Sequence, residues 1–529
     1  MSKKVYVRDS TGLTKELSAK TILMANLVGM GVGIAPTTAY YASLLYPGVN
    51  LPATVLVGIL PALAVGFVYF FLSAAMPRTG GEYVWVSRIL SPSFGFLVNF
   101  LITSVLWESI ATFAATSISH GLVPMLGALG LLYSNESLIG LVSAIKYAPV
   151  KLVIILMITS LCSLPAFFGT RNTFKTVWMI FGITAVGTIV TVGAFLVAGP
   201  TNFIANFNQL SGMNYVKVIS TAGLPTGYSI QATVYGSVFT MLAFIGYNFS
   251  SYYNGEIKGI SRSQFVGMIG GIFVFAAAFG LLLSAVYYSI GSDFINAISN
   301  LAGTGNSYYQ LPSAPLVNFL VLFATPNPVV IILSSFAVLA ANMSAIVLFY
   351  FIIVRNFFAW SFDRILPDWF VKLSSRTNSP WLSLIVILAL ADFSALLYVY
   401  TIFFELLVYQ VVLFGIAYAI TCLAAVLFPY RKRSLFNAAP QFVRTTVRGI
   451  PLISILGLIG VVVSVLITVF AVLPVVTPLP SGSTIVEAGA YLFVPASVVA
   501  AFVIFWASYF YNKRKGTDIL LAFRQLPPE

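Results

Sequence analysis

Charged side chains are scarce in this sequence. They account for 8% of its 529 residues, whereas soluble domains carry about 25%. Hydrophobic residues make up 59%, and they fall into runs of about 20 residues, the length that crosses a bilayer as one helix. The composition therefore excludes a soluble protein and predicts an all-α polytopic membrane protein.

Histidine and cysteine are nearly missing as well. His120 is the only histidine, so a histidine cluster for zinc or iron is excluded. Cys162 and Cys422 lie in separate apolar runs, with neither a disulfide framework nor the spacing of metal ligands. The chain also lacks a GxxxxGK[ST] phosphate loop. We expect no cofactor and no metal, and any uphill transport would draw on a gradient rather than on ATP.

The apolar residues form twelve runs that are bounded by charged, polar, proline or glycine residues. Each run is long enough for one membrane-spanning helix. The connections 199–231 and 291–327 are the longest and are polar, which predicts loops outside the membrane. The predicted spans are 20–43, 51–75, 94–123, 149–168, 176–198, 232–254, 265–290, 328–357, 381–400, 404–428, 451–473 and 488–511.

Lysine and arginine favour one side of this arrangement. Of the 27 basic residues, all but Lys146, Lys151 and Lys217 fall on the side that also holds both termini. Because cytoplasmic loops are enriched in Lys and Arg, both termini are predicted to be cytoplasmic. The net charge of +13 then reflects topology and contact with anionic membrane lipids, and it requires no nucleic-acid partner.

The first span contains an unusual run of glycines. In NLVGMGVGIAPTT, Gly29, Gly31 and Gly33 occupy alternate positions and Pro36 follows. These residues weaken a helix, and unpaired backbone groups at mid-depth are tolerated only beside a cavity or a ligand. The run predicts an interruption of the helix, which we call the first break (29–34). Close packing of small residues against a neighbouring helix is the alternative.

The sixth span has a matching feature. In TMLAFIGYNFSSYYNGEIKG, Gly246 and Asn248 interrupt the apolar run, and we call residues 244–248 the second break. Transporters built from inverted repeats break corresponding helices at the substrate site. The sequence thus predicts a 5+5 inverted repeat with discontinuous helices 1 and 6, followed by helices 11 and 12.

The ends of interrupted helices suit a zwitterionic small molecule. Their N–H groups attract an anion and their carbonyls attract a cation. We expect the substrate to bind at Gly29, Met30, Gly31, Val32, Gly33, Ile34, Phe244, Ile245, Gly246, Tyr247 and Asn248. The predicted divisions of the chain are 1–19 (cytoplasmic), 20–198 (first repeat), 199–231 (external loop), 232–428 (second repeat), 429–511 (last two spans with the preceding loop) and 512–529 (cytoplasmic tail).

Several stretches resemble the amino acid–polyamine–organocation (APC) permeases. The most specific is AMPRTGGEYVWVSRILSPSFGF (75–96), between the second and third spans. GMGVGIA in the first break, FIGYN followed by GEIKGISR, and RNFFAWSFDRILPDWF after the eighth span are also similar to the family's patterns. The resemblance implies a leucine-transporter-like fold and alternating-access transport of amino acids or related amines across the cell membrane. Asn248 stands where many members have Glu, and Val32 replaces a common Ser.

The connection 75–96 also carries charge. Arg78, Glu82 and Arg88 lie beside a Gly-Gly turn and an aromatic, amphipathic segment. We expect a short helix that locks to the ends of the sixth or eighth span through ion pairs when the inner gate closes, with Glu256 and Lys258 in the same gating region. An interfacial anchor without a gating role is the alternative.

Two carboxylic acids lie near mid-depth, Glu108 in the third span and Asp392 in the ninth. No Lys or Arg lies at a similar depth, so each acid must be protonated, hydrogen-bonded, or paired with a transiently bound cation. Glu108 is favoured for proton coupling. Binding of a substrate's cationic group and a structural hydrogen bond are its alternatives, and a structural role is favoured for Asp392.

Sodium coupling is predicted less strongly than proton coupling. The family's fold has a sodium position between carbonyls of helix 1 and hydroxyls of helix 8, where this chain offers Asn342 and Ser344. A single hydroxyl provides little for Na⁺, which takes several oxygen ligands. Proton symport is therefore favoured, and exchange or sodium symport by the same fold are the alternatives.

Functions of other classes fit the sequence poorly. A membrane-embedded enzyme would need clustered catalytic side chains, and a sensor would normally add a soluble output domain. Neither is found, so the chain is predicted not to be an enzyme. The substrate's side chain stays open, because Phe244, Tyr247 and Phe249 fit a neutral or apolar one whereas Glu108 would suit a cationic one.

Overall fold

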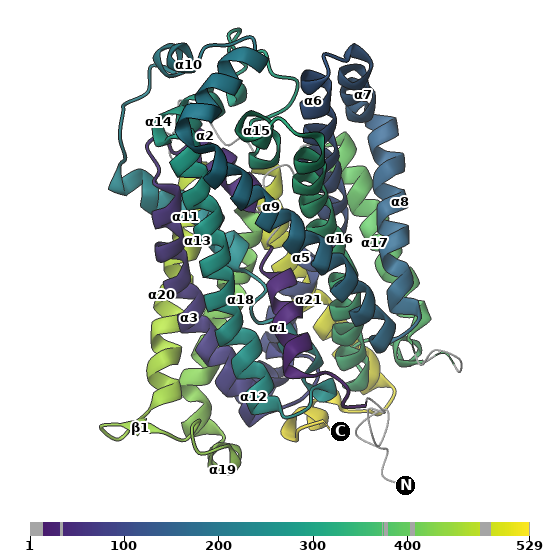
Figure 1. The fold of residues 1–529 in the computed structure, drawn as a ribbon. Helices are drawn as coiled ribbons and strands as arrows, with labels where there is room; N and C mark the ends of the chain where they lie inside the picture. Colours follow the sequence, from purple (N-terminus) through teal and green to yellow (C-terminus); the bar gives the residue numbers. More distant parts are fainter. Residues whose placement is uncertain are drawn as a thin grey trace.

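The computed structural model is a bundle of long, roughly parallel and antiparallel helices (Figure 1). It describes residues 14–31, 35–372, 374, 379–401, 408–476 and 488–527. Within these ranges, 11 helices are long and apolar enough to cross a membrane. They match the predicted second to twelfth spans and confirm an all-α polytopic membrane fold, whereas the inverted-repeat relationship stays a prediction.

The helix bounds agree with the predicted runs to within a few residues in most cases. Several spans contain more than one helical segment, because a π-turn or a break interrupts them. The segments are α3 (Leu51–Ala75), α5 (Pro92–Thr116) with η1 (Ser117–Leu122) and α6 (Val123–Leu132), α8 (Ala148–Phe167), α9 (Thr170–Leu210), α11 (Ile230–Phe244) with η2 (Phe249–Glu256), α12 (Ile260–Gln264) with η3 (Phe265–Gly270) and α13 (Gly271–Ile290), α16 (Pro328–Phe362), α17 (Trp381–Tyr400), α18 (Val408–Arg431), α20 (Leu452–Val476) and α21 (Ala488–Arg514).

The first predicted span is divided between two short helices, α1 (Ala19–Gly29) and α2 (Ala35–Leu45). Neither is long enough to cross a bilayer alone, since a span needs about 20 residues. Ser18 caps the start of α1 by accepting a hydrogen bond from the backbone N–H of Thr21. The division falls at the first break, so the two helices together take the place of the first predicted span.

Burial separates a central layer of helices from a peripheral one. In the most apolar 18-residue segment of each span, 89% of the residues are buried in Pro92–Leu132 and in Pro328–Phe362. The corresponding shares are 22% in Leu452–Val472 and 17% in Leu492–Arg514. The third and eighth spans therefore lie inside the bundle, and α20 and α21 expose most of their surface to lipid. α16 packs along α9, where Thr191 donates a hydrogen bond to Ser334 at 2.8 Å.

Both long connections predicted as loops contain helices. α9 continues past the predicted end of the fifth span at residue 198, through a kink at Gly199, whose φ of +59° precedes Pro200. α10 (Tyr215–Ala222) follows, and α14 (Ser292–Gly303) and α15 (Val317–Ala324) lie in the second connection. Every residue of α15 is buried. These apolar segments were too short to be distinguished from loops by hydropathy.

The first and the last described residues lie at the same end of the bundle, opposite α10 and α14 (Figure 1). There Leu17 forms a parallel bridge with Ile257. This end, which we call the terminal end, is the one predicted to be cytoplasmic, and that orientation stays a prediction. It also contains α4 (Glu82–Ile89), α19 (Arg433–Ala438), the two-residue strands β1 (Thr446–Val447) and β2 (Ile450–Pro451), and the 3-10 helices η4 (Asp368–Val371) and η5 (Ile519–Arg524).

Packing of α4 against α5 gives a first prediction. A methyl group added at Gly95 would lie 2.3 Å from Ser87 Cβ, which no ordinary contact allows. Gly95→Leu should destabilise the protein by about 1–3 kcal/mol, because overpacking forces neighbouring segments apart. Thermal unfolding in detergent measures this, with Gly182→Leu as the control, since nothing lies within 4 Å of a methyl at Gly182. An equal melting temperature for both variants would contradict the packing.

Candidate substrate and coupling site

The first break begins where α1 ends at Gly29. The N–H of Met30 still donates to the Asn26 carbonyl at 2.8 Å. Gly31 then turns the chain with a φ of +60°, a conformation that favours glycine. The remaining predicted binding residues of this break, Val32, Gly33 and Ile34, lie outside the described residues.

The second break begins where α11 ends at Phe244. Ile245 is extended, and Gly246 has a φ of +113°. A methyl group on Gly246 would lie 2.3 Å from the carbonyl carbon and oxygen of Gly29. The two breaks therefore touch through bare backbone, and glycine is what permits the contact. The structure brings together the two interruptions that the sequence predicted more than 200 residues apart.

A chain of buried polar side chains ties the two broken helices together. Asn26 donates to Ser250 Oγ at 3.0 Å and accepts from the Ser250 N–H at 3.0 Å. Ser250 in turn donates to Gln264 at 2.6 Å. Sequence reasoning missed these residues, although a buried Asn within an apolar run was the available signal. They fix how η2 lies against α1.

Asn248 lies at the end of the second break and is fully buried. Its Oδ1 accepts a hydrogen bond from the Tyr418 hydroxyl on α18 at 3.0 Å. Its Nδ2 has no hydrogen-bond partner. A buried amide donor without a partner costs about 1–3 kcal/mol, so this N–H group is available to an anionic ligand.

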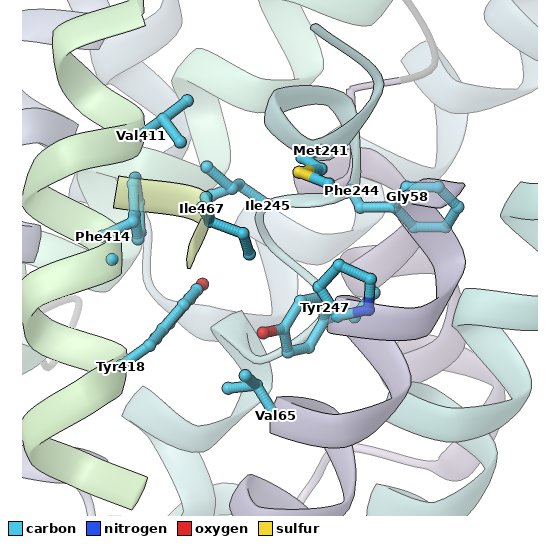
Figure 2. A pocket seen from close by; sticks show the side chains of 13 residues that line it. Gly58, Val65, Met241, Phe244, Ile245, Tyr247, Val411, Phe414, Tyr418 and Ile467 are labelled. Atoms are coloured by element: carbon cyan, nitrogen blue, oxygen red, sulfur yellow. The ribbon is translucent and has the colours of Figure 1, made fainter. Parts of the chain in front are cut away.

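A small cavity of about 30 Å³ adjoins the second break, between α3, α18 and α20. Figure 2 shows the hydroxyls of Tyr247 and Tyr418 directed into this space among apolar side chains. This volume admits a water molecule or two. The lining residues are Gly58, Pro61, Ala62, Val65, Met241, Phe244, Ile245, Tyr247, Val411, Phe414, Gly415, Tyr418 and Ile467.

Glu108 is fully buried between α5 and α18. One carboxyl oxygen accepts from the Thr112 hydroxyl, and the other accepts from Gln410 Nε2 at 2.7 Å. Gln410 also donates to Ser109 at 3.1 Å. Both carboxyl oxygens thus have neutral donors, as expected for an intramembrane acid without a lysine or arginine. Gln410 lies 302 positions away in the sequence, and no sequence signal indicated it.

The other predicted ion-coupling residues have local partners. Asp392 accepts from Thr159 of α8 at 3.0 Å, which joins two outer helices. Ser344 donates to the Ala341 carbonyl of its own helix at 2.8 Å, and Asn342 is buried nearby. These contacts do not test sodium binding at Asn342 and Ser344, which stays a prediction.

The charged connection 75–96 forms the expected short helix, α4, and every residue of it is buried. Burial of both faces argues against an interfacial anchor. Arg88 forms an ion pair with Asp363, just after α16, at 2.8 Å with both side chains 1% exposed. Tyr83 donates to the same carboxylate at 2.7 Å. The predicted link to the end of the eighth span is therefore present.

The remaining charges of the gating region behave differently. Arg355 of α16 forms an ion pair with Glu256 at 2.6 Å, which ties η2 to α16. Arg78 donates to the Pro527 carbonyl at 2.8 Å, and the Lys258 N–H donates to the Leu17 carbonyl at 2.9 Å. Glu82 was expected to join an ion pair, but its hydrogen-bond partner is the neutral amide of Asn99 at 2.8 Å rather than a cation.

The fold and the site define a polytopic membrane protein with two interrupted helices that meet inside the bundle. A family model described as amino acid permease matches residues 16–494. The chain belongs to this family, which confirms the resemblance to APC permeases.

Individual relatives are distant. The chain is 26% identical over 276 residues to Asc-type amino acid transporter 1 of Mus musculus, which covers 50% of this chain and 46% of the relative. It is 23% identical over 353 residues to the branched-chain amino acid permease BcaP of Lactococcus lactis, covering 65% and 68%. It is 24% identical over 304 residues to the serine/threonine exchanger SteT of Bacillus subtilis, covering 55% and 57%. The match to the mouse protein thus spans about half the length of that relative.

The contact between the breaks yields a second prediction. Gly246→Ala should weaken amino-acid binding by about 10- to 100-fold, because a methyl group would push Gly29 away and strain the backbone by about 1–3 kcal/mol. A binding titration with the amino acid that most stabilises the wild type measures the change. Gly280→Ala is the matched control, since its added methyl would meet only Val55, at 3.9 Å. Normal binding by a folded Gly246→Ala protein would rule out the site.

Proposed function

We propose that this protein is a secondary transporter that carries neutral, apolar amino acids across the cell membrane by alternating access, coupled to protons. The observation that carries the proposal is the contact of Gly29 with Gly246, where two interrupted helices meet. Family membership supports transport, and the names of the relatives, which concern amino acids, support the substrate class.

The helix ends at the two breaks offer a place for both charges of an amino acid. α1 and α11 end there with carbonyls, which attract an ammonium group. α2 begins just after the first break with N–H groups, and Asn248 Nδ2 adds an unpartnered donor, which together suit a carboxylate. No metal or cofactor is needed for this recognition.

An apolar side chain fits the surroundings better than a cationic one. The cavity beside the second break is lined by aliphatic and aromatic residues, with Tyr247 and Tyr418 as its polar contributions. Glu108, the acid that could have received a cationic group, already accepts from Thr112 and Gln410. One relative is named a branched-chain amino acid permease, which agrees with this choice.

Glu108 is the proposed coupling residue. Taken as a carboxylate, it accepts from two neutral donors, and a bound proton would weaken the contact with Gln410, because a neutral acid is a poorer acceptor. Gln410 lies on α18, which also carries Tyr418, the donor to Asn248. A change in the protonation of Glu108 can therefore act on the second break through α18. Exchange without protons is the second candidate, favoured by the name of one relative, a serine/threonine exchanger.

The two buried ion pairs at the terminal end are proposed to close the inner side of the site. Arg88–Asp363 joins α4 to the end of α16, and Arg355–Glu256 joins α16 to η2. Removing one partner of a buried pair costs about 3–5 kcal/mol, because the other charge is left uncompensated. These pairs would separate whenever η2 swings away to open the inner side.

A third prediction concerns Glu108. Glu108→Gln should abolish amino-acid accumulation driven by a pH gradient in proteoliposomes, because the amide cannot take up or release a proton. Uptake of radiolabelled leucine with and without the gradient measures this, and Asp392→Asn serves as the matched control in an outer helix. Accumulation at the wild-type level, with an unchanged pH profile, would remove Glu108 from coupling.

A fourth prediction concerns the inner closure. Arg355→Met should raise the reactivity of a cysteine placed at Ser251 toward a membrane-impermeant maleimide by about tenfold or more, because loss of the ion pair shifts the population toward the open inner side. The label is applied from the terminal side in a background that lacks Cys162 and Cys422. Arg262→Met, at an exposed position, is the control. Equal labelling of the two variants would refute the closing role.

A further inference from the structure

A buried polar cluster lies between α4 and η2 that the proposed transport steps do not use. At its centre is Glu82, the first residue of α4, which is fully buried. Its Oε1 accepts from Asn99 of α5 at 2.8 Å, and Asn99 accepts in turn from the Trp360 indole at 2.8 Å. We call Glu82, Asn99, Tyr69 and Tyr252 the Glu82 cluster.

The other carboxyl oxygen of Glu82 has no hydrogen-bond partner. The hydroxyls of Tyr69 on α3 and Tyr252 on η2 lie close enough to act on this carboxyl, but neither forms a hydrogen bond of ordinary geometry with it. A buried carboxylate oxygen without a partner is costly. A proton on that oxygen would remove the charge and supply a donor for a tyrosine oxygen, so the geometry suits the protonated acid.

The charged groups around the cluster are occupied elsewhere. Arg88, on the same helix, binds Asp363 at 2.8 Å, and Arg78 donates to the Pro527 carbonyl. From the elements packed against α4, the titratable groups that act on Glu82 are the three tyrosines Tyr69, Tyr252 and Tyr418. Among the described residues, no lysine or arginine neutralises this carboxyl.

The cluster is connected to the second break through protein contacts. The Gly80 N–H donates to the Tyr252 carbonyl at 3.0 Å, which ties the start of α4 to η2. The ring of Tyr69 contacts the ring of Tyr418 with centroids 5.6 Å apart, and Tyr418 donates to Asn248. The ring of Tyr418 therefore lies between the Glu82 cluster and the cavity that Tyr418 lines.

We propose that Glu82 is a second proton-binding site, which holds its proton while η2 packs against α4 and releases it at the terminal end when η2 moves away. The proposal rests on the proton-coupled function above and adds the exit point of the proton. Opening would admit water to the carboxyl, and the O–H bond would break with transfer of the proton to that water. The carboxylate left behind is then hydrated, which favours the open arrangement until Glu82 is protonated again.

The pH range follows from burial. Burial raises the pKa of Glu82 from 4.5 to about 7, against the opposing effect of the Asn99 hydrogen bond. A raised pKa means that the closed arrangement binds the proton more tightly than the open one. The closed arrangement is therefore favoured at acidic pH and loses this advantage as the pH rises from 4.5 through about 7. Release near neutral pH suits a cytoplasmic exit.

Infrared difference spectroscopy on the purified protein in liposomes tests the site without reference to transport. The wild type should lose the carbonyl stretch of a protonated carboxyl as the pH rises through about 7, the pKa of Glu82. The part of this change that belongs to Glu82 should be missing in Glu82→Gln and should remain in Glu108→Gln, where Glu108 contributes nothing. An identical titration in Glu82→Gln would overturn the proposal.

A second variant keeps the test decisive if Glu82→Gln fails to fold. Asn99→Leu removes the hydrogen bond that lowers the pKa of Glu82, so the midpoint of the infrared titration should move to higher pH. A role limited to packing would leave that midpoint unmoved, and an unmoved midpoint would overturn the proposal.

Transport measurements separate this proposal from the proposed function. Suppose that transport is proton-coupled and that Glu82 binds the proton. Glu82→Gln should then accumulate less leucine under a pH gradient, relative to its leucine counterflow, by about tenfold or more. A wild type that accumulates no amino acid under a pH gradient would refute proton coupling. The infrared titration would still decide whether Glu82 binds the proton, because it requires no substrate.

Discussion

The architecture depends on one contact, the approach of Gly246 to the Gly29 carbonyl inside the membrane. Backbone groups that leave a helix at this depth need partners, because lipid supplies none. The second break can lie against the first because neither glycine carries a Cβ. Other contacts follow from this approach: Asn26 bonds Ser250 across it, and Asn248 comes within reach of Tyr418. A site for a zwitterion arises where two helices expose their ends to each other.

Charge is distributed around this contact in two distinct ways. At the terminal end, Arg88 and Arg355 are matched by carboxylates, and these pairs hold α4, η2 and α16 together. By contrast, Glu108 in the third span has neutral donors, and Glu82 on α4 has a single amide donor. Matched pairs suit closure, since separating them is costly. Unmatched acids suit proton binding, since a proton removes their charge.

Much of the fold was predictable because membrane insertion leaves a strong signal in sequence. A run of about 20 apolar residues indicates a membrane-spanning helix with little ambiguity, and glycine with asparagine inside such a run indicates an interruption. Short helices outside the membrane gave no such signal, so α10, α14 and α15 were predicted as loops. The ion pair from Arg88 to the end of the eighth span was expected, whereas Glu82 was expected to join an ion pair and instead bonds Asn99.

The sequence by itself determined that this is a membrane protein of about twelve spans, where its helices are interrupted, and which family it resembles. These properties are local, since each depends on residues within one span or one connection. Only the tertiary structure decided which side chains meet: Gln410 with Glu108, Ser250 with Asn26, and Asn99 with Glu82. Partners such as Gln410 and Glu108, 302 positions apart, are brought together by the packing of whole helices, which no pattern within one segment records.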